Sequence, residues 1–442
     1  MGSRGRILCV SLLALALAVL GGRPAQAAEK AIWGPTTLPG GGSAFPTYRH
    51  LGVDTLQLYL EWGTVAPSRP RDTSNPADPA YRWPADLDRS ISEAASNGMR
   101  IALVVRGSPA WANGGRSPID VPSAAEFATF VATASRRYPY VRRWMIWGEP
   151  NRDDRFQPNA PDSPIGPRAY APILDAAYGA LKGVSPANIV IGGMTWTGGT
   201  VKPAPFLRYM RLPNGRPPRL DWFGHNPFPF RFPDLREEYI PGGWRDMSDM
   251  DLFSEELRRV YGPRVRLWLA EFQVLSDKPS REFESFVPLQ AQGDWLTAAY
   301  RIADNLPSIA GMGWLGLLDE PERPGSSNSG LLTASGARKP AFEAFRRAPS
   351  VRFRPSVRVS GRAARRALST RGLNAMVRPR IGGRISAELV TSRGRRLLRT
   401  TRHVRRGKLG RLRLRGRAPR GRFTVVVRGP RAESVRRAIR VK

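Results

Sequence analysis

Short apolar runs alternate with amphipathic helical patterns from residue 32 to about residue 347, and this alternation limits the possible folds more than any other feature. Strand, helix and strand in succession are typical of a parallel sheet wound with helices. Helical spacing of apolar residues is clearest at Ser123–Tyr138, Pro167–Gly183 and Leu289–Asn305. Strands are predicted at Ala31–Gly34, Thr55–Leu60, Arg100–Val105, Arg143–Trp147, Asn188–Gly192, Leu220–His225, Val265–Ala270 and Gly311–Leu315. Eight such units predict an α/β fold, a (β/α)8 TIM barrel over residues 28–349.

The N-terminus has the three-part layout of a secretory signal peptide. Arg4 and Arg6 precede an apolar run from Ile7 to Leu20, and Ala25-Gln26-Ala27 follows as a small-residue cleavage site. We therefore expect residues 1–27 to be removed and the protein to be secreted or cell-wall-associated. The alternative is an uncleaved N-terminal anchor. No later segment is long and apolar enough to span a bilayer, so no transmembrane segment is expected after cleavage.

Cysteine and histidine are too sparse for a metal or thiol site. Cys9 is the only cysteine and lies inside the apolar run, so the mature chain would have no thiol for disulfides or for nucleophilic catalysis. His50, His225 and His403 are isolated in the sequence, and no spaced cluster of Asp, Glu and His accompanies them. We therefore expect neither a metal nor another cofactor.

Positive charge is concentrated at the C-terminus. The chain has a net charge of +34, but residues 351–442 contain only two acidic residues, Glu388 and Glu433, among many arginines. Strands predicted at Val351–Val359, Ile385–Leu389, Arg411–Leu414 and Phe423–Val427, with Gly- and Arg-rich turns between them, favour a small basic β-sandwich at residues 350–442. Such a domain is expected to bind anionic cell-surface polymers. The alternative is a solvated surface that reflects an arginine-favouring genome. No nucleic-acid-binding signature accompanies the charge, so no nucleic acid is expected as a partner.

Two acidic residues directly follow apolar strands of the predicted barrel. Glu149 follows Arg143–Trp147, and Pro150 then ends the strand pairing; Glu271 follows Val265–Ala270. Catalytic residues of (β/α)8 barrels project from the carboxyl ends of strands, and strands four and seven face each other across the barrel mouth. Either glutamate alone is more often a helix cap or an arginine partner. Two together, each after a Trp-bearing strand, predict a catalytic pair.

A pair of carboxyl groups suits the cleavage of a glycosidic bond. Retaining hydrolysis uses two carboxyl groups roughly 5–5.5 Å apart, one to protonate the leaving oxygen and one to attack the anomeric carbon. The acid must stay protonated near neutral pH, which burial and a neighbouring carboxylate favour by raising its pKa. Glu149 and Glu271, with Trp147, Trp268 and Phe272 around them, are predicted to form this pair.

At these residues the chain resembles glycoside hydrolase clan A, particularly families 39 and 5. The resemblance covers about residues 31–347. Further residues that carry it are Trp62, the run Gly107-Ser108-Pro109-Ala110-Trp111-Ala112, His225, Trp314, and the segment from Gly330-Leu331 to Lys339-Pro340-Ala341. The resemblance implies that Glu149 is the general acid/base, that Glu271 is the nucleophile, and that the protein is a retaining glycosidase of β-linked poly- or oligosaccharides.

Two departures from the family pattern favour a rival interpretation. Gly148 stands where the family usually has the Asn that hydrogen-bonds the sugar 2-hydroxyl, and Gln57 stands where strand two often presents an Arg near the nucleophile. The rival is a non-catalytic glycan-binding or wall-associated protein on the same barrel. Retention of Glu149 and Glu271 favours the enzyme.

Aromatic and polar residues near the predicted mouth are candidates for substrate binding. Sugar rings stack on aromatic faces and their hydroxyls need oriented polar partners. Trp314 is the first candidate platform, and Trp62 and Trp111 follow it. His225 is predicted to contact the substrate or orient Glu271, against the alternative of an ordinary buried histidine. Arg106 and Asn151 complete the predicted substrate-binding set.

Overall fold

The computed structural model describes residues 28–349 and, in the C-terminal part, residues 356–360, 365–370, 372–378, 383–391, 395–405, 408–429 and 434–441. The predicted signal peptide and Cys9 lie outside the described residues, as does the first half of the predicted strand Val351–Val359. Among the helices of these described ranges, none has the length and apolar character needed to cross a membrane.

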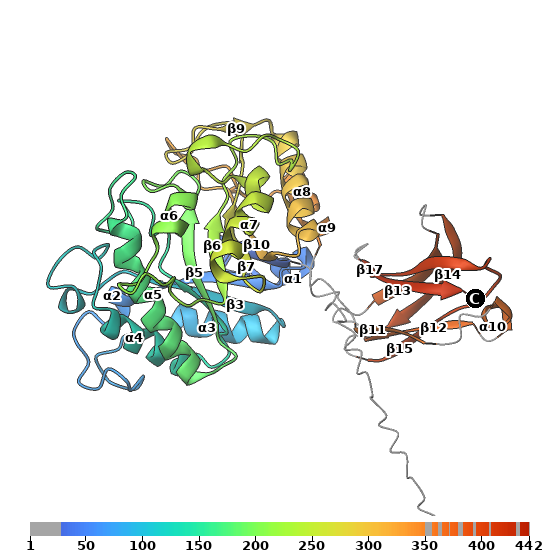
Figure 1. Ribbon diagram of the computed structural model, residues 1–442, viewed down its shortest axis with the longest axis horizontal. Helices are drawn as coiled ribbons and strands as arrows, with labels where there is room; N and C mark the ends of the chain where they lie inside the picture. Colours follow the sequence, from blue (N-terminus) through green and yellow to red (C-terminus); the bar gives the residue numbers. More distant parts are fainter. Residues whose placement is uncertain are drawn as a thin grey trace, which may run out of the picture.

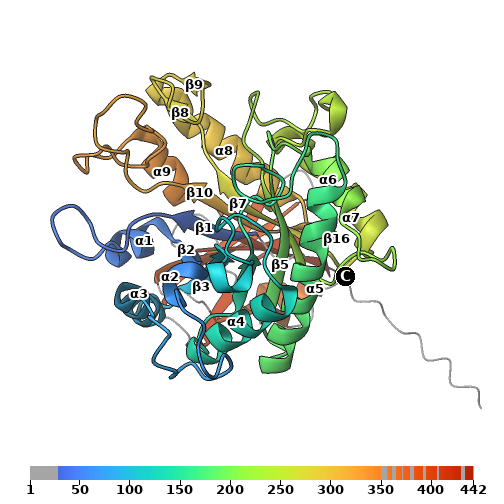
Figure 2. The same cartoon turned by 90° about the vertical axis from the view of Figure 1, so that its left-hand side faces the viewer.

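Eight parallel strands close into a barrel in the order β1-β10-β7-β6-β5-β4-β3-β2 (Figures 1 and 2). The predicted (β/α)8 fold is therefore confirmed. The strands are β1 (Glu29–Trp33), β2 (Thr55–Glu61), β3 (Arg100–Arg106), β4 (Arg143–Ile146), β5 (Ile189–Trp196), β6 (Trp222–Asn226), β7 (Arg266–Phe272) and β10 (Ile309–Leu315). All eight overlap the predicted ranges.

Helices surround the strands, as Figure 2 shows. They are α1 (Phe45–Leu51), α2 (Trp62–Val65), α3 (Ala85–Ser96), α4 (Ala124–Arg137), α5 (Ile165–Val184), α6 (Pro203–Tyr209), α7 (Met250–Tyr261), α8 (Leu289–Asn305) and α9 (Pro340–Arg347). Short one-turn segments lie at Ala110–Ala112, Pro241–Gly243 and Met247–Asp249, and the loop after β7 contains the two-residue strands β8 (Leu275–Ser276) and β9 (Phe286–Val287).

Helix α4 illustrates how the local sequence fixes an element. The Ser123 side chain accepts a hydrogen bond from the backbone N–H of Glu126 at the start of the helix, and Arg136 and Arg137 lie in its last turn, where cations favour the helix dipole. Phe127, Phe130, Val131 and Ala134 are buried at helical spacing. This apolar face packs into the core between the helices and the barrel.

The barrel interior is filled rather than open. Ala102, Val104, Met145, Ile191 and Trp268 form part of a buried cluster inside the strands. Below it, Glu29 forms ion pairs with Arg143 and with Arg100, whose Nη1 lies 3.0 Å away. Burial alone would raise the pKa of Glu29, but the two arginines outweigh it and hold the pKa below its ordinary value. The described side chains therefore fill the barrel interior next to this charged cluster.

The C-terminal part forms two antiparallel sheets, as predicted for a sandwich. One sheet has the order β11-β12-β15 and the other β14-β13-β16-β17. Both sheets contribute side chains to one buried cluster, which includes Val377, Leu412, Ile385 and Val425. The elements are β11 (Ser356–Ser360), α10 (Arg365–Thr370), β12 (Leu373–Arg378), β13 (Gly383–Val390), β14 (Arg396–Val404), β15 (Gly410–Leu414), β16 (Gly421–Arg428) and β17 (Ser434–Val441).

Strand register places seven arginines on the outer face of the four-stranded sheet. Residues directly opposite each other in antiparallel strands share a face, and the opposed pairs include Arg422 with Arg440 and Glu388 with Arg399. Glu388 is the acidic residue of this face, and three arginines lie within 3.3–3.6 Å of it. We call this surface the basic face; its arginines are Arg384, Arg396, Arg399, Arg422, Arg428, Arg436 and Arg440.

Candidate active site

Glu149 follows β4 in an unusual backbone conformation. Both Trp147 and Glu149 have positive φ angles, 65° and 51°, which side-chain-bearing residues rarely adopt. Each costs on the order of 1–3 kcal/mol and persists only where surrounding contacts hold it. The Glu149 N–H donates to Met194 O at 3.1 Å, and the Trp147 indole N–H donates to Arg155 O at 2.9 Å. This strained turn directs the Glu149 side chain to the mouth.

The Glu149 carboxylate has two direct partners. Asn226 Nδ2, at the end of β6, donates to its Oε1 at 2.9 Å. Arg152 Nη1 donates to its Oε2 at 2.9 Å, and Arg155 Nε lies 4.0 Å from the same oxygen. Burial is the largest influence and raises the pKa of Glu149, while Arg152 and Asn226 lower it and Glu282 raises it. The net direction is upward.

Glu271, near the end of β7, has a different environment. The pairing of β7 with β10 shifts register between Leu269 and Phe272, and such irregularities re-aim side chains at barrel rims. Within the described residues, no hydrogen bond or ion pair holds the Glu271 carboxylate. Burial and then the charge of Glu149 raise the pKa of Glu271 to about 8. The two glutamates therefore affect each other's ionisation across the mouth.

Strands β1, β2 and β3 supply a second group of side chains beside Glu271. The ring of Tyr59 stacks on Trp33 with centroids 4.6 Å apart, and the Arg106 guanidinium lies 4.3 Å from the Tyr59 ring centroid. Arg106 Nε also donates to Glu61 Oε1 at 2.7 Å. Enclosure at the mouth and then the charge of Glu271 raise the pKa of Tyr59. The predicted site residue Arg106 is thus in the same region as the pair.

Gln57 does not occupy the place of the family's arginine. It is fully buried inside the barrel, where its Nε2 donates to Ala270 O at 2.7 Å and its Oε1 accepts from Trp268 Nε1 at 3.0 Å. Tyr59, two residues further along β2, is the residue that this strand presents at the mouth. Gln57 is therefore a structural residue beneath the site. The presence of Gln at this position is not an argument that the protein has lost catalytic activity.

The space beside Gly148 is available to a side chain. A Cβ at Gly148 would lie 3.7 Å from a Val104 methyl group and 3.8 Å from Arg106, both ordinary contact distances. Gly148 also lies outside the left-handed region. The guanidinium group of Arg106 thus lies next to the space that the side chain of an Asn at position 148 would enter.

Two predicted aromatic platforms are buried, and this corrects the expectation. Trp314 and Trp62 are both 0 % exposed. Successive residues of a strand point to opposite faces, and Gly313 faces the barrel interior, so Trp314 points out of the barrel. The Trp314 indole N–H donates to Ser329 O at 3.0 Å. Trp62 packs against Phe127 and Phe130 of α4. Neither ring offers a face for sugar stacking.

Two predicted polar site residues are also structural. His225 is 0 % exposed, with Nε2 2.7 Å from Arg245 O and Nδ1 2.9 Å from Thr195 O. Burial lowers the pKa of His225 to about 4, so it is neutral and faces the protein, contrary to the expectation of substrate contact. Asn151 Nδ2 donates to Trp196 O and Val201 O, both at 2.9 Å. Asn151 holds the loop after β4 against the loop after β5.

Trp111 is the third predicted aromatic residue for substrate binding, and unlike Trp62 and Trp314 it is only half-buried. Its ring is half-buried, packs edge-to-face on Trp62 at 5.4 Å, and has the Arg69 guanidinium 5.7 Å from its centroid. Its indole N–H donates to Ala66 O at 2.8 Å. No described contact joins it to either glutamate.

Sequence reasoning missed several residues of the mouth. Asn226 and Arg152 contact Glu149 directly, Tyr59 lies beside Glu271, and Gln273 lines a cavity next to it. Asn226 ends β6 and Gln273 follows β7, so the rule that carboxyl ends of barrel strands converge was the available signal for both. The contact of Arg152 depends on the path of a loop and had no such signal.

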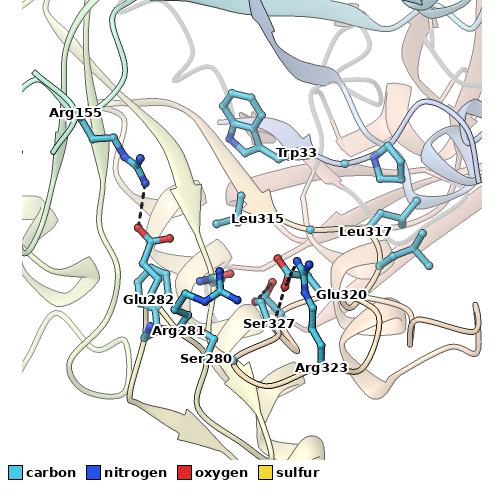
Figure 3. A pocket seen from close by; sticks show the side chains of 18 of the residues that line it. Trp33, Arg155, Ser280, Arg281, Glu282, Leu315, Leu317, Glu320, Arg323 and Ser327 are labelled. Carbon is cyan, nitrogen blue, oxygen red and sulfur yellow. Dashed lines mark hydrogen bonds and ion pairs between the residues drawn. The ribbon is translucent and has the colours of Figure 1, made fainter. Parts of the chain in front are cut away.

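A cavity of about 660 Å³ opens at the mouth between β1, β7 and β10 (Figure 3). Trp33, Gln273 and Leu315 line its inner part, and Arg152 and Arg155 line the side towards Glu149. Among the described residues, no three His, Cys, Asp or Glu side chains gather closely enough to hold a metal ion.

Comparisons with known proteins agree with this architecture. No family model matches the sequence, and a search of curated proteins finds no relative. Among solved structures, a family 39 glycoside hydrolase from the gut symbiont Bacteroides cellulosilyticus WH2 superposes with a TM-score of 0.55 at 16% identity, covering 88% of this chain and 81% of that one. A monomeric β-xylosidase from Caulobacter crescentus CB15 superposes with a TM-score of 0.50 at 13% identity, covering 88% and 96%. At these identities the likeness establishes the fold: the chain resembles family 39 glycoside hydrolases in its architecture.

Proposed function

We propose that the protein is a retaining glycoside hydrolase that acts on β-linked poly- or oligosaccharides. The observation that carries the proposal is the pair of enclosed, electrostatically coupled carboxyl groups from the ends of β4 and β7. Two such groups repel when both are ionised, so near neutral pH the pair holds one proton. One acid and one carboxylate are what double displacement requires.

In the first step Glu149 donates its proton to the glycosidic oxygen, and the Glu271 carboxylate attacks the anomeric carbon. The carbon–oxygen bond to the leaving group breaks as the ester bond to Glu271 forms. In the second step Glu149, now ionised, takes a proton from water, whose oxygen attacks the same carbon and releases Glu271. The sugar leaves with its original anomeric configuration.

The contacts of the free protein favour the shared proton on Glu271. Arg152 and Asn226 stabilise charge on Glu149, whereas Glu271 has no such partner among the described residues. Double displacement therefore requires the shared proton to move to Glu149 when substrate binds. Arg106, whose charge lowers the pKa of Glu271, supports that transfer.

The second candidate function is glycan binding without catalysis. The presence of glycine at position 148 favours it. Without an amide at this position, the sugar 2-hydroxyl lacks the partner that strengthens in the transition state. The structural role of Gln57 removes the other argument for this alternative.

Azide trapping tests the proposal and the two roles together. With an aryl β-glycoside that has a good leaving group, Glu149→Ala should yield the β-glycosyl azide, because azide attacks the glycosyl-enzyme from the face that the leaving group vacated. Glu271→Ala should yield the α-glycosyl azide, because azide then replaces the nucleophile in a single displacement. Exchanged products would reverse the roles, and a wild-type protein that binds but never cleaves any glycan would favour the binding protein.

We further propose that the protein is exported and that its basic face binds an anionic wall polymer. The first part rests on the signal-peptide pattern, and N-terminal sequencing of the extracellular protein should begin near residue 28. The second rests on seven arginines against Glu388, since guanidinium groups match carboxylate and phosphate geometry.

A matched pair of variants tests the basic face. Arg422→Gln/Arg440→Gln removes two opposed arginines of this face, while Arg411→Gln/Arg413→Gln removes two exposed arginines of β15 in the other sheet. Only the first should lower the salt-sensitive retention of the full chain on purified cell walls. Equal losses would mean that net charge alone causes adhesion.

A further inference from the structure

The cavity beside Glu271 combines a buried polar end with a charged rim. Its inner wall includes Gln273, which follows Glu271 by two residues, and Trp33, whose indole N–H donates to Ala270 O at 3.0 Å. Its rim is formed by Arg281 and its neighbours on the loop between β8 and β9, and by Arg323 beyond β10 (Figure 3). At about 660 Å³ the cavity has the size of a typical small-ligand site.

Gln273 has an unsatisfied acceptor at the inner end. Its side chain is 4 % exposed, and its Oε1 has no hydrogen-bond partner in the described part of the chain. Most buried polar groups are paired, and leaving a buried amide oxygen without a partner is unfavourable. This oxygen is shielded from the cavity; exchanging the two ends of the amide would turn it towards the cavity, where a ligand hydroxyl group would donate to it.

The charges of the rim leave one cation without a partner. Glu282 is already paired with Arg152 at 2.7 Å and Arg155 at 3.6 Å, and Glu320 lies 3.5 Å from Arg323. Arg281 has no acidic partner among the described residues. Figure 3 shows its guanidinium group between these two pairs.

The position of Arg281 is fixed by its backbone. Its N–H donates to Gly325 O at 3.0 Å, and a Cβ at Gly325 would come within 3.2 Å of the Arg281 Cβ. In the same turn, the Phe283 N–H donates to Ser280 Oγ at 3.1 Å. Arg281 therefore extends from an anchored turn at the rim of the cavity, with its side chain exposed to an incoming anion.

We propose that this cavity is a subsite for a carboxylate-bearing sugar unit, in which Arg281 pairs with the carboxylate and the Gln273 amide forms a hydrogen bond with a hydroxyl group. The inference rests on the proposed glycosidase function and names its substrate class as an acidic glycan. A uronic acid fits because it brings one negative charge for one free guanidinium, and hydroxyl groups a few ångströms away for the amide. The ring of Trp33 forms an apolar wall beside it.

Two hexasaccharides that differ only in the group at C6 test the subsite. The probes are the β-1,4-linked hexamers of mannuronic acid and of mannose, which share stereochemistry and differ in the C6 carboxylate. Binding is measured by calorimetry on the full chain carrying Glu271→Gln, because that carboxylate has no contact to disturb and turnover would stop. Salt at 0.3 M screens exposed arginines more than a cavity pair.

The expected result is a selective loss in two variants. Arg281→Gln should weaken binding of the mannuronate hexamer about tenfold and leave the mannose hexamer unchanged. Gln273→Met, which removes the amide at similar volume, should weaken both hexamers alike. Arg259→Gln on α7, an equally charged change at a 72 % exposed site outside the cavity, should alter neither.

Other outcomes overturn the inference. If Arg281→Gln leaves the preference for the acidic hexamer intact, or if Arg259→Gln causes the same loss, the recognition is not in this cavity. Failure here is separable from failure of the proposed reaction. Azide trapping could succeed while the hexamers bind alike, which rejects only the subsite. Selective binding of the mannuronate hexamer without any glycosyl azide product would mean that the barrel binds acidic glycans but does not cleave them.

Discussion

The ends of β4 and β7 present the same residue in opposite surroundings. Glu149 is held by a strained turn, accepts from Asn226, and is paired with Arg152 at 2.9 Å. Glu271 follows a register shift and lies near Tyr59 and Arg106 without a direct partner among the described residues. Burial raises the pKa of both carboxyl groups. Arg152 and Asn226 favour charge on Glu149, whereas Glu271 has no such contact among the described residues.

The largest expected effect is on turnover. Glu149→Gln and Glu271→Gln should each lower kcat by about a thousandfold or more, because each removes one half of the acid and nucleophile pair. Initial rates on an aryl β-glycoside measure this effect. The control is Glu322→Gln, which changes a carboxylate that is 82 % exposed and should retain wild-type rates. Activity of either variant within tenfold of wild type would contradict the assigned pair.

The next effect concerns the pH dependence of kcat/KM. The pKa of about 8 for Glu271 predicts loss of activity above about pH 8, when the pair loses its last proton. Arg152→Gln removes a cation beside Glu149, so both pKa values rise and the alkaline limb should move up by about one pH unit. Arg155→Gln, 4.0 Å from the same oxygen, should move it less. A shift to lower pH in either variant would refute the role given to Arg152.

A smaller effect is expected on stability. The pKa of Glu271 is about 8 in the folded protein and about 4.3 in an unfolded chain, so between these values the folded state holds a proton that the unfolded state has released. Stability due to Glu271 is thus present below about pH 4.3 and is lost as pH rises to about 8. Glu271→Gln should raise Tm by a few degrees at pH 8 and hardly at pH 4.5. Thermal unfolding at both pH values measures this, with Glu322→Gln as the charge-matched control.

The smallest effect is expected at Gly148. Because a Cβ there meets only ordinary contacts, Gly148→Ala should keep the wild-type Tm within a few degrees. Gly148→Asn should raise kcat/KM about threefold for a β-glycoside with a 2-hydroxyl and leave the 2-deoxy analogue unchanged. If Gly148→Asn lowers kcat/KM for both the glycoside and its 2-deoxy analogue, Arg106 already fills the space that the Asn amide would need.

The sequence predicted the barrel because apolar periodicity is a local property. All eight strands and the helices α4, α5 and α8 overlap the predicted ranges, and Glu149 and Glu271 both follow the strands that were expected to carry them. In the C-terminal part, β12, β14 and β17 were not predicted. Arginines interrupt the apolar residues in β14 and β17, so the hydrophobic signal of these strands is weak and only cross-strand pairing defines them.

What the sequence alone determined is the alternation of strands and helices, the two acidic strand ends and the location of the charge. Tertiary structure decided the direction and partners of each side chain. Trp314 and His225 end strands as expected, yet both are fully buried in contact with protein. Arg152 reaches Glu149 through the path of a loop that no local pattern marks. The reason is physical: periodicity depends on neighbours along the chain, whereas a register shift, a positive φ or the path of a loop depends on contacts between distant residues.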